Sequence, residues 1–211
     1  MPNDTLALPP LGRRQVLAGI PALGATMLIA PAWAAVPVGE AVTVTGRVDV
    51  ARADTVVPLV PGAAIELNDR IVTRRDGLAM LMLEDRSEIH LGSEAEILID
   101  AFIANQRGVM SVGGPMLFNR PEDLSPTDIT IRSAFAQIGV RGTRFFAGPT
   151  KGKYSVFVDR GSVSVLAAGV KRILEAGDGV EFETQGGPPG PVVAWGEGRI
   201  AEAFASVGVS R

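Results

Sequence analysis

The stretch that decides the fold is Ile138-Gly139-Val140-Arg141-Gly142-Thr143-Arg144-Phe145-Phe146. Apolar residues flank its polar centre, as is typical of strands, and two glycines interrupt it. A second strand-like stretch follows, which reads Tyr154-Ser155-Val156-Phe157-Val158-Asp159-Arg160-Gly161-Ser162-Val163-Ser164-Val165. The run therefore lies inside a strand-rich region.

Outward from this run, the pattern from Ala41 onward predicts an all-β domain. Short apolar or alternating runs are broken by glycine, aspartate, asparagine and proline. The valines of Val42–Val50 fall on one alternating face, and Gly46 is expected to bend or bulge the strand between them. Gly77–Leu83 has no polar face, so we expect this strand to be covered on both sides.

Two short segments resemble each other and bear on the architecture. Leu83–Ser87 and Val158–Ser162 each read as the end of a strand followed by a tight polar turn, and an alternating strand follows each. Such units are compatible with the stacked rungs of a β-solenoid. A sandwich-like stack of short strands has the same sequence pattern, so both architectures remain open.

The run 138–146 resembles the V-R-G-T-x-F signature of FecR-type periplasmic domains. Other parts of the family pattern follow the expected order between about Val57 and Glu183. Leu67–Thr73 resembles an apolar strand that ends in threonine, and Gly77–Ser87 resembles a strand, a D-G-S turn and the next strand. Arg86 replaces the glycine of that turn, which predicts a less strained turn. The closing strands of the family are matched by Gly161–Val165 and Leu174–Val180.

The resemblance implies an all-β, FecR-like β-solenoid or sandwich-like stack that senses and relays rather than catalyses. We expect an exported module of envelope signalling, whose partner is a receptor or membrane sensor. Family members that regulate sigma factors carry a cytoplasmic anti-sigma segment before a membrane helix. Because Met1–Gly12 alone precede Arg13, we expect no direct anti-sigma activity. The alternative is a structural envelope protein that binds carbohydrate or peptidoglycan.

The amino terminus has the layout of a signal peptide. Arg13 and Arg14 precede a charge-free stretch, 15–35, which predicts an N-terminal signal helix. Together with Leu17 they resemble a twin-arginine export signal, with ordinary secretion as the alternative. Ala32 and Ala34 supply the small residues of a cleavage site. We therefore expect a periplasmic protein without membrane insertion after cleavage; an uncleaved inner-membrane anchor is the minority alternative.

These boundaries predict three parts: a signal peptide over 1–34, a FecR-like β domain over 35–185, and a linker with a C-terminal helix over 186–211. Gln185–Pro191 is rich in glycine and proline and predicts neither strand nor helix. Beyond it, one helix face is formed by Ile200, Ala203, Phe204 and Val207. We expect this helix to cap the open end of the β-stack, or alternatively to dock a partner.

Composition excludes several classes of function. The chain has no cysteine, which excludes disulfides and thiolate sites, and its formal net charge is −3. A weakly acidic chain has no electrostatic reason to bind nucleic acid or anionic lipid. Composition sets no oligomeric state.

The chemistry-bearing residues do not predict an enzyme, and we expect no catalytic residue, metal site or cofactor. His90 is the single histidine, and strand alternation places it outward beside Glu88. The acidic residues between Glu84 and Asp100 lack the spacing of a calcium loop and are expected in solvated turns. Aromatic residues are 5% of the chain, which leaves Tyr154 or Trp195 as a possible sugar-stacking platform.

The candidate partner-binding motif is Arg141, Gly142 and Thr143. Arg141 can present a planar fork of donors to a partner carboxylate or carbonyl, and Gly142 can let a backbone approach. In the structural interpretation Arg141 bonds carbonyls at a strand turn, Gly142 supplies an unusual backbone angle and Thr143 ties off a turn. The apolar flanks favour this second interpretation.

Overall fold

The computed structural model describes residues 37–104, 106–125 and 127–210. The chain divides into two compact units, Met1–Trp33 and Ala34–Arg211. The first unit lies outside the described residues. Outside them too lie the predicted signal peptide over 1–34 and its export residues Arg13, Arg14, Leu17, Ala32 and Ala34.

The second unit is mostly β, and its described residues form short strands followed by a short helix. The strands are β1 (Pro37–Thr45), β2 (Val48–Arg52), β3 (Thr55–Pro58), β4 (Ala64–Glu66), β5 (Arg70–Thr73), β6 (Leu78–Leu83), β7 (Glu88–Leu91), β8 (Glu96–Ile103), β9 (Arg107–Gly113), β10 (Met116–Asn119), β11 (Asp128–Arg132), β12 (Gln137–Thr150), β13 (Lys153–Ala167), β14 (Val170–Glu175), β15 (Asp178–Phe182) and β16 (Val193–Ala194). The helix is α1 (Glu197–Ala205). Within residues 37–210, no helix has the length and apolar character that crossing a bilayer requires.

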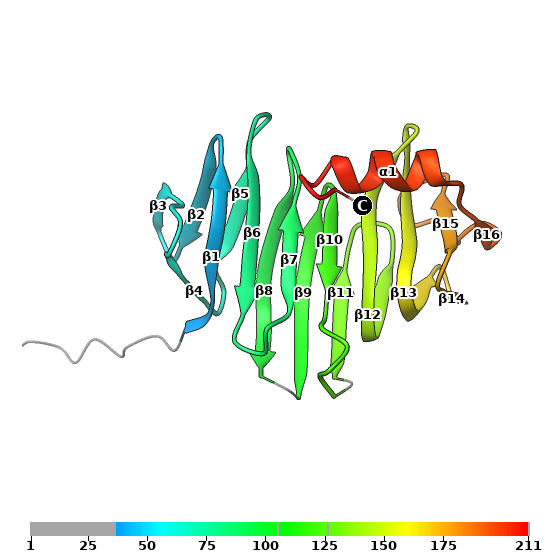
Figure 1. Cartoon of the computed structure of the whole chain (residues 1–211), viewed down its shortest axis with the longest axis horizontal. Coiled ribbons are helices and arrows are strands. Elements are labelled where there is room, and N and C mark those ends of the chain that lie inside the picture. The colour runs from blue at the N-terminus through cyan, green and yellow to red at the C-terminus, as the bar shows by residue number, and fades with distance from the viewer. Residues whose placement is uncertain (1–36, 105, 126, 211) are drawn as a thin grey trace, which may run out of the picture. The chain divides into compact units, whose positions relative to one another are not determined.

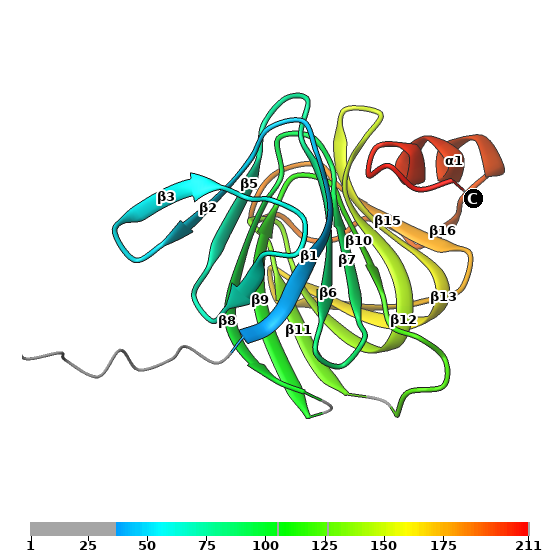
Figure 2. The same cartoon turned by 60° about the vertical axis from the view of Figure 1, so that its left-hand side comes forward.

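Hydrogen bonds join these strands into one mixed sheet. Its main path runs β3-β2-β5-β8-β9-β11-β12-β10-β7-β6-β1-β4, and β13 joins it at β12. β9 and β11 are parallel, whereas β11 and β12 are antiparallel. The sheet curls on itself (Figure 1, Figure 2). The predicted choice between solenoid and sandwich thus gives way to a single curled sheet.

Two long strands, β12 and β13, run through both halves of the curl. In β12, Gln137–Val140 pairs with β11, whereas Arg144–Ala147 pairs with β10. In β13, Ser162–Ala167 pairs with β14 and Tyr154–Phe157 with β15. We call β2, β3, β5, β8, β9, β11 and β14 the first arm, and β1, β4, β6, β7, β10, β15 and β16 the second arm.

A hydrophobic core fills the inside of the curl, and both arms contribute to it. Successive strand residues point to opposite faces, so every second residue turns inward. Ile97 and Ile129 enter from the first arm, and Leu81 and Phe118 from the second; all four are buried. The rings of Phe118 and Phe145 lie 5.7 Å apart between centroids. Burial of these side chains is the main force that holds the curl closed.

The helix α1 covers the outer face of the second arm, which differs from the predicted cap on an open end. Its predicted apolar face is buried and packs on outward-pointing side chains of β10, β12 and β13. The members of this second cluster are Leu117, Phe146, Phe157, Trp195, Ile200, Ala203, Phe204 and Val207. Phe145 and Phe146 therefore serve two different cores from adjacent positions. The helix packs on a face because that is where the apolar outer residues are.

Arg199 fastens this helix to the sheet. Its guanidinium donates to Thr150 Oγ1 at 2.6 Å, to Ser155 Oγ at 2.9 Å and to Glu181 Oε1 at 2.6 Å. The same group lies 3.7 Å from the ring centroid of Trp195. The hydrogen bonds and the contact with the Trp195 ring together attach the helix to the sheet at a defined position.

Several local expectations are corrected by the structure. β6 buries every second residue and leaves Met80 and Met82 half-exposed, so it is not covered on both sides. Val42 is exposed because a register shift between Ala41 and Thr43 turns it outward. The strand therefore alternates differently from the simple pattern.

The two resembling segments also differ in structure. Leu83–Ser87 forms the turn between β6 and β7, whereas Val158–Ser162 lies inside β13 and bends it between the arms. Arg86 has a φ of 63°, so the turn keeps the left-handed conformation that glycine adopts at lower cost. The predicted relief of strain at this position is wrong.

A buried ion pair ties the β6–β7 turn to the loop after β10. Arg120 Nη1 donates to Asp85 Oδ2 at 2.5 Å and to Ser87 Oγ at 3.1 Å, and Arg120 Nη2 donates to the Ser125 carbonyl at 2.9 Å. Arg120 and Asp85 are each about 1% exposed at the side chain. Asp85 is therefore buried and not solvated as we expected, because the loop after β10 folds over it.

Loss of Asp85 should be costly, since it removes a carboxylate that the buried Arg120 guanidinium contacts. We expect Asp85→Ala to lower the free energy of unfolding by about 3 to 5 kcal/mol in urea denaturation. Asp123→Ala is the matched control, because its ion pair with Arg86 is exposed on both sides and should contribute little to stability. Equal losses in the two variants would contradict the role of burial.

Candidate functional site

The signature run lies where β12 passes from the first arm to the second. The pairing register with β13 shifts between Arg141 and Arg144. Gly142 has a φ of 66°, and Gly161 on β13 has a φ of 79°. Both angles are in the left-handed region that side chains other than glycine seldom adopt. Both strands therefore bend at glycines.

The two glycines are required for different reasons. A Cβ on Gly161 would lie 2.7 Å from the Gly142 carbonyl oxygen and 2.9 Å from Thr143 Cγ2. A Cβ on Gly142 would meet nothing within 4 Å. Close backbone approach therefore occurs at Gly161, whereas Gly142 supplies the backbone angle alone.

The bend places the three signature residues in different environments. Thr143 is fully buried, Gly142 is half-buried and Arg141 is exposed. Among the described residues, the Arg141 side chain forms no hydrogen bond or ion pair, so the expected bond to carbonyls at a strand turn is not found. Of the three, Arg141 is the residue that a partner can reach.

Arg141 lines a groove of about 400 Å³ on the outer face of the first arm. We call this the outer groove. Residues of β11, β12, β13 and β14 line it. Its polar lining residues and one exposed apolar residue are Asp128, Thr130, Arg141, Ser162, Ser164 and Ile173. Polar side chains make most of its outward-pointing surface.

Gly139 forms the floor of the outer groove. It pairs with Thr130 on one side and with Ser164 on the other. A Cβ at Gly139 would lie 2.7 Å from Ser164 Oγ, so a side chain here would displace that hydroxyl. The glycine leaves backbone exposed between two hydroxyl groups. Such a floor accepts a ligand that hydrogen-bonds through its own backbone or hydroxyls.

Sequence reasoning missed Thr130 and Ser164 as site residues. Each stands between two buried residues of its strand; Thr130, for example, lies between Ile129 and Ile131. This alternation indicates that the side chain points outward. Nothing in the sequence indicated that the strands of Thr130 and Ser164 both flank Gly139. The groove depends on that pairing.

His90 lies on the outer face of the second arm, as predicted, but is half-buried there. Its Nε2 lies 3.5 Å from Glu88 Oε2, and Asn119 Nδ2 donates to the same Glu88 oxygen at 2.9 Å. Burial lowers the pKa of His90 below its ordinary value, and Arg144 lowers it further, whereas Glu88 opposes both. Glu88 is thus held by an amide as well as by the imidazole.

Two other acidic residues, Asp49 of β2 and Asp69 just before β5, form ion pairs. Asp69 accepts two hydrogen bonds from the Arg52 guanidinium at 2.7 and 2.6 Å. A hydrogen bond from Arg74 lowers the pKa of Asp49. Over residues 37–104, 106–125 and 127–210, no group of three or more histidine, aspartate or glutamate side chains is arranged to hold a metal ion.

The two candidate stacking platforms are not exposed. Tyr154 stacks on Phe135 with ring centroids 4.4 Å apart, and Trp195 stacks on Phe157 at 4.8 Å. Both rings are more than nine-tenths buried. Neither can offer a free face to a sugar.

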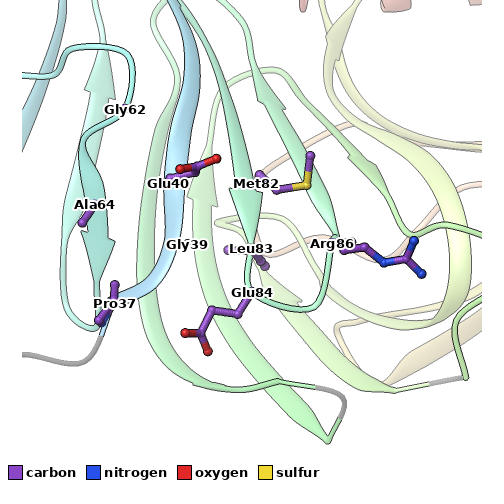
Figure 3. Close-up of a pocket in the computed structure, with 9 residues that line it drawn as sticks. All are labelled: Pro37, Gly39, Glu40, Gly62, Ala64, Met82, Leu83, Glu84 and Arg86. Atoms are coloured by element: carbon purple, nitrogen blue, oxygen red, sulfur yellow. The ribbon is translucent and has the colours of Figure 1, made fainter.

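A second hollow lies on the outer side of the second arm, between β1, β4 and β6 (Figure 3). It has a volume of about 420 Å³ and a mostly apolar lining that includes Met82 and Leu83. Arg86 at its rim is paired with Asp123 at 2.5 Å. We place the candidate site at the outer groove instead, because the signature residue Arg141 lines it.

Comparison with protein families finds a match to part of this chain. Residues 69–164 match the family model described as FecR protein. This range contains the bend and the floor of the outer groove but not α1. No curated protein sequence matches the chain.

Two crystal structures of a "putative anti-sigma factor" from Parabacteroides distasonis ATCC 8503 are similar in fold. The first has a TM-score of 0.53 at 16% identity and covers 64% of this chain and 63% of that chain. The second has a TM-score of 0.52 at 17% identity and covers 64% of this chain and 62% of that chain. This chain thus spans less than two thirds of either protein, and the similarity establishes the fold alone.

The lowered pKa of His90 predicts a pH dependence of stability. Below about pH 6.5 the unfolded chain binds a proton that the folded chain resists, so stability falls as the pH drops through that value. His90→Gln removes this loss, and its melting temperature should fall less than that of the wild type between about pH 7 and 5. Parallel melting curves for the two proteins over this range would show that His90 does not contribute.

The bend predicts unequal costs for two alanine substitutions. Gly142→Ala should cost about 1 to 2 kcal/mol, since it forces alanine into the left-handed conformation without a clash. Gly161→Ala adds a collision with backbone and should cost roughly 1 to 3 kcal/mol more. Urea denaturation of both variants checks this, and a Gly161→Ala cost equal to or below that of Gly142→Ala would contradict the close approach.

Proposed function

We propose, from the premise that this chain belongs to the FecR domain family, that it is a signalling module that binds a protein partner through the outer groove. Membership of the family is carried by residues 69–164. The partner we propose is a receptor or membrane sensor of the cell envelope. The proposed output is a change in the activity of that partner.

The observation that carries this proposal is the position of Arg141. The backbone beside it belongs to the bend, where Gly142 and Gly161 adopt left-handed angles and Thr143 is buried. The guanidinium is exposed at the edge of a polar groove and forms no ion pair among the described residues. A preorganised, unpaired arginine is well suited to bind a carboxylate or carbonyl of a partner.

We also propose that the protein acts outside the cytoplasm. The support is the pair Arg13 and Arg14 before a charge-free stretch, with Ala32 and Ala34 as the cleavage residues. A periplasmic location agrees with a partner in the envelope. Detection of the mature N-terminus in a periplasmic fraction would test this location.

We infer that the module is not an enzyme. FecR-type proteins generally have no catalytic activity, and His90 is held between Glu88 and the positive charge of Arg144 in a half-buried position. A general base must reach a substrate proton, and a half-buried imidazole near a guanidinium is poorly placed for this.

The test is partner capture by crosslinking in intact envelopes. The tagged full chain is compared with Arg141→Glu and with Arg75→Glu, which reverses an exposed arginine in the turn before β6, away from the groove. We expect one membrane protein to be enriched with the wild type and Arg75→Glu, and to be reduced about tenfold or more with Arg141→Glu. Mass spectrometry identifies the captured protein.

Two outcomes would overturn the proposal. Equal capture by all three proteins would show that the outer groove does not bind the partner. Retention on purified peptidoglycan without any captured protein would favour the alternative, a carbohydrate-binding envelope protein. We include this alternative in the test because the hydroxyls of Thr130 and Ser164 beside Gly139 can also hydrogen-bond a carbohydrate.

A further inference from the structure

We propose that the outer groove binds an extended, acidic polypeptide segment that crosses the strands of the first arm. This inference rests on the proposed function, since it takes the outer groove as the partner-binding surface. It adds the chemistry of the partner and the direction in which the segment lies.

The strand register defines a continuous path for such a segment. Outward residues line up across five strands, in the order Val109, Thr130, Gly139, Ser164 and Ile173. Neighbouring strands lie about 4.8 Å apart, so the path is about 19 Å long. An extended chain of about six residues, at about 3.3 Å per residue, fills that length.

The middle of this path suits a polypeptide backbone. Gly139 offers a flat floor, and the hydroxyls of Thr130 and Ser164 stand on either side of it. A hydroxyl both donates and accepts, so it can bond either the N–H or the C=O of an extended segment. Ile173 at the end of the path is 52% exposed and provides a contact for an aliphatic side chain.

Exposed cations flank the path on both sides. On one side of the path lies a row of paired outward residues that includes Arg107 and Arg141. On the other side lies a second such row, which includes Arg132 and Lys171. All four are exposed, and among the described residues none of them forms an ion pair. Exposed cations therefore stand on both sides of the path.

This pattern contrasts with the rest of the described surface, where arginines are commonly paired. Arg52, Arg74 and Arg86, for example, each hold a carboxylate at 2.7 Å or less. Near the path the carboxylates are Asp128 and Glu175, both in the row that contains Arg141, and Asp100, which accepts a hydrogen bond from Ser111 Oγ in the row of Arg132. The four cations thus outnumber the three carboxylates on a chain whose formal net charge is −3.

The two charged edges match the alternation of an extended polypeptide. Successive side chains of such a segment point to opposite sides, so acidic residues in neighbouring positions reach both edges. A glycan would be favoured by an exposed aromatic platform, but Tyr154 and Trp195 are buried elsewhere. The geometry therefore favours an acidic peptide over an anionic glycan.

The experiment measures binding of a defined probe to the full chain. The probe is a fluorescent, terminally blocked octapeptide in which pairs of adjacent glutamates are separated by single serines and which ends in leucine, so that neighbouring glutamates point to both edges. Binding is followed by fluorescence anisotropy. We expect saturable binding that weakens as salt is added, because exposed charges are screened. Arg141→Glu and Lys171→Glu should each weaken binding about tenfold or more, since they reverse charges on opposite edges.

The controls separate the groove from general charge. Arg75→Glu makes the same charge reversal at a position outside the groove, and it should change the affinity by less than about twofold. A peptide with lysine in place of glutamate should not bind. Unchanged far-UV circular dichroism and melting temperature show that each variant is folded, and the two groove variants lie on different strands, so a folding defect in one leaves the other as a test.

The results distinguish this inference from the proposed function. Failure of the acidic peptide to bind, an equal loss with Arg75→Glu, or binding of a galacturonic acid hexamer in place of the peptide would overturn the acidic-segment inference. If envelope capture still depends on Arg141, the proposed function stands with a different kind of partner segment. If capture is independent of Arg141 as well, both are overturned.

Discussion

The bend shared by β12 and β13 is the constraint on which the other features depend. These strands carry the chain from one arm of the sheet to the other, and they pair with each other on both sides of the bend. Gly142 and Gly161 supply the left-handed angles, and the absence of a Cβ at Gly161 allows the strands to touch. Without this bend the two arms would not face a common interior. The hydrophobic core inside the curl is a consequence of it.

The same bend divides the outer surface into a covered part and an open part. On the second arm, Phe146 and Phe157 point outward and are covered by α1, which Arg199 holds in place. On the first arm, most outward residues of β12 and β13 are polar or glycine, and no helix covers them among the described residues; they are Gln137, Gly139, Arg141, Ser162, Ser164 and Leu166. An apolar outer face requires a cover, whereas a polar one is stable in water. The outer groove is therefore on the arm that the helix leaves free.

The run 138–146 contains both residues that stabilise the fold and the residue that we propose binds a partner. Thr143 and Phe145 are buried and belong to the scaffold, while Arg141, two residues before Thr143, reaches solvent. The residues that match the FecR model include this run and the buried pair of Asp85 and Arg120. A rigid scaffold lowers the entropy that an exposed side chain loses on binding, which is how a small surface motif can be specific.

The sequence by itself determined the local structure of this protein. Alternation identified the mostly β character, the spacing of Ile200, Ala203 and Phe204 identified the helix face, and the signature run lies within the residues that match the FecR family model. The tertiary structure alone decided which strands are neighbours. Alternation shows which residues of a strand share a face, but the pairing partner is distant in sequence and is set by burial of the whole core. For this reason Val158–Ser162 was mistaken for a turn, Arg120 was overlooked as a buried partner of Asp85, and the outer groove between β11, β12, β13 and β14 was invisible until the strands were paired.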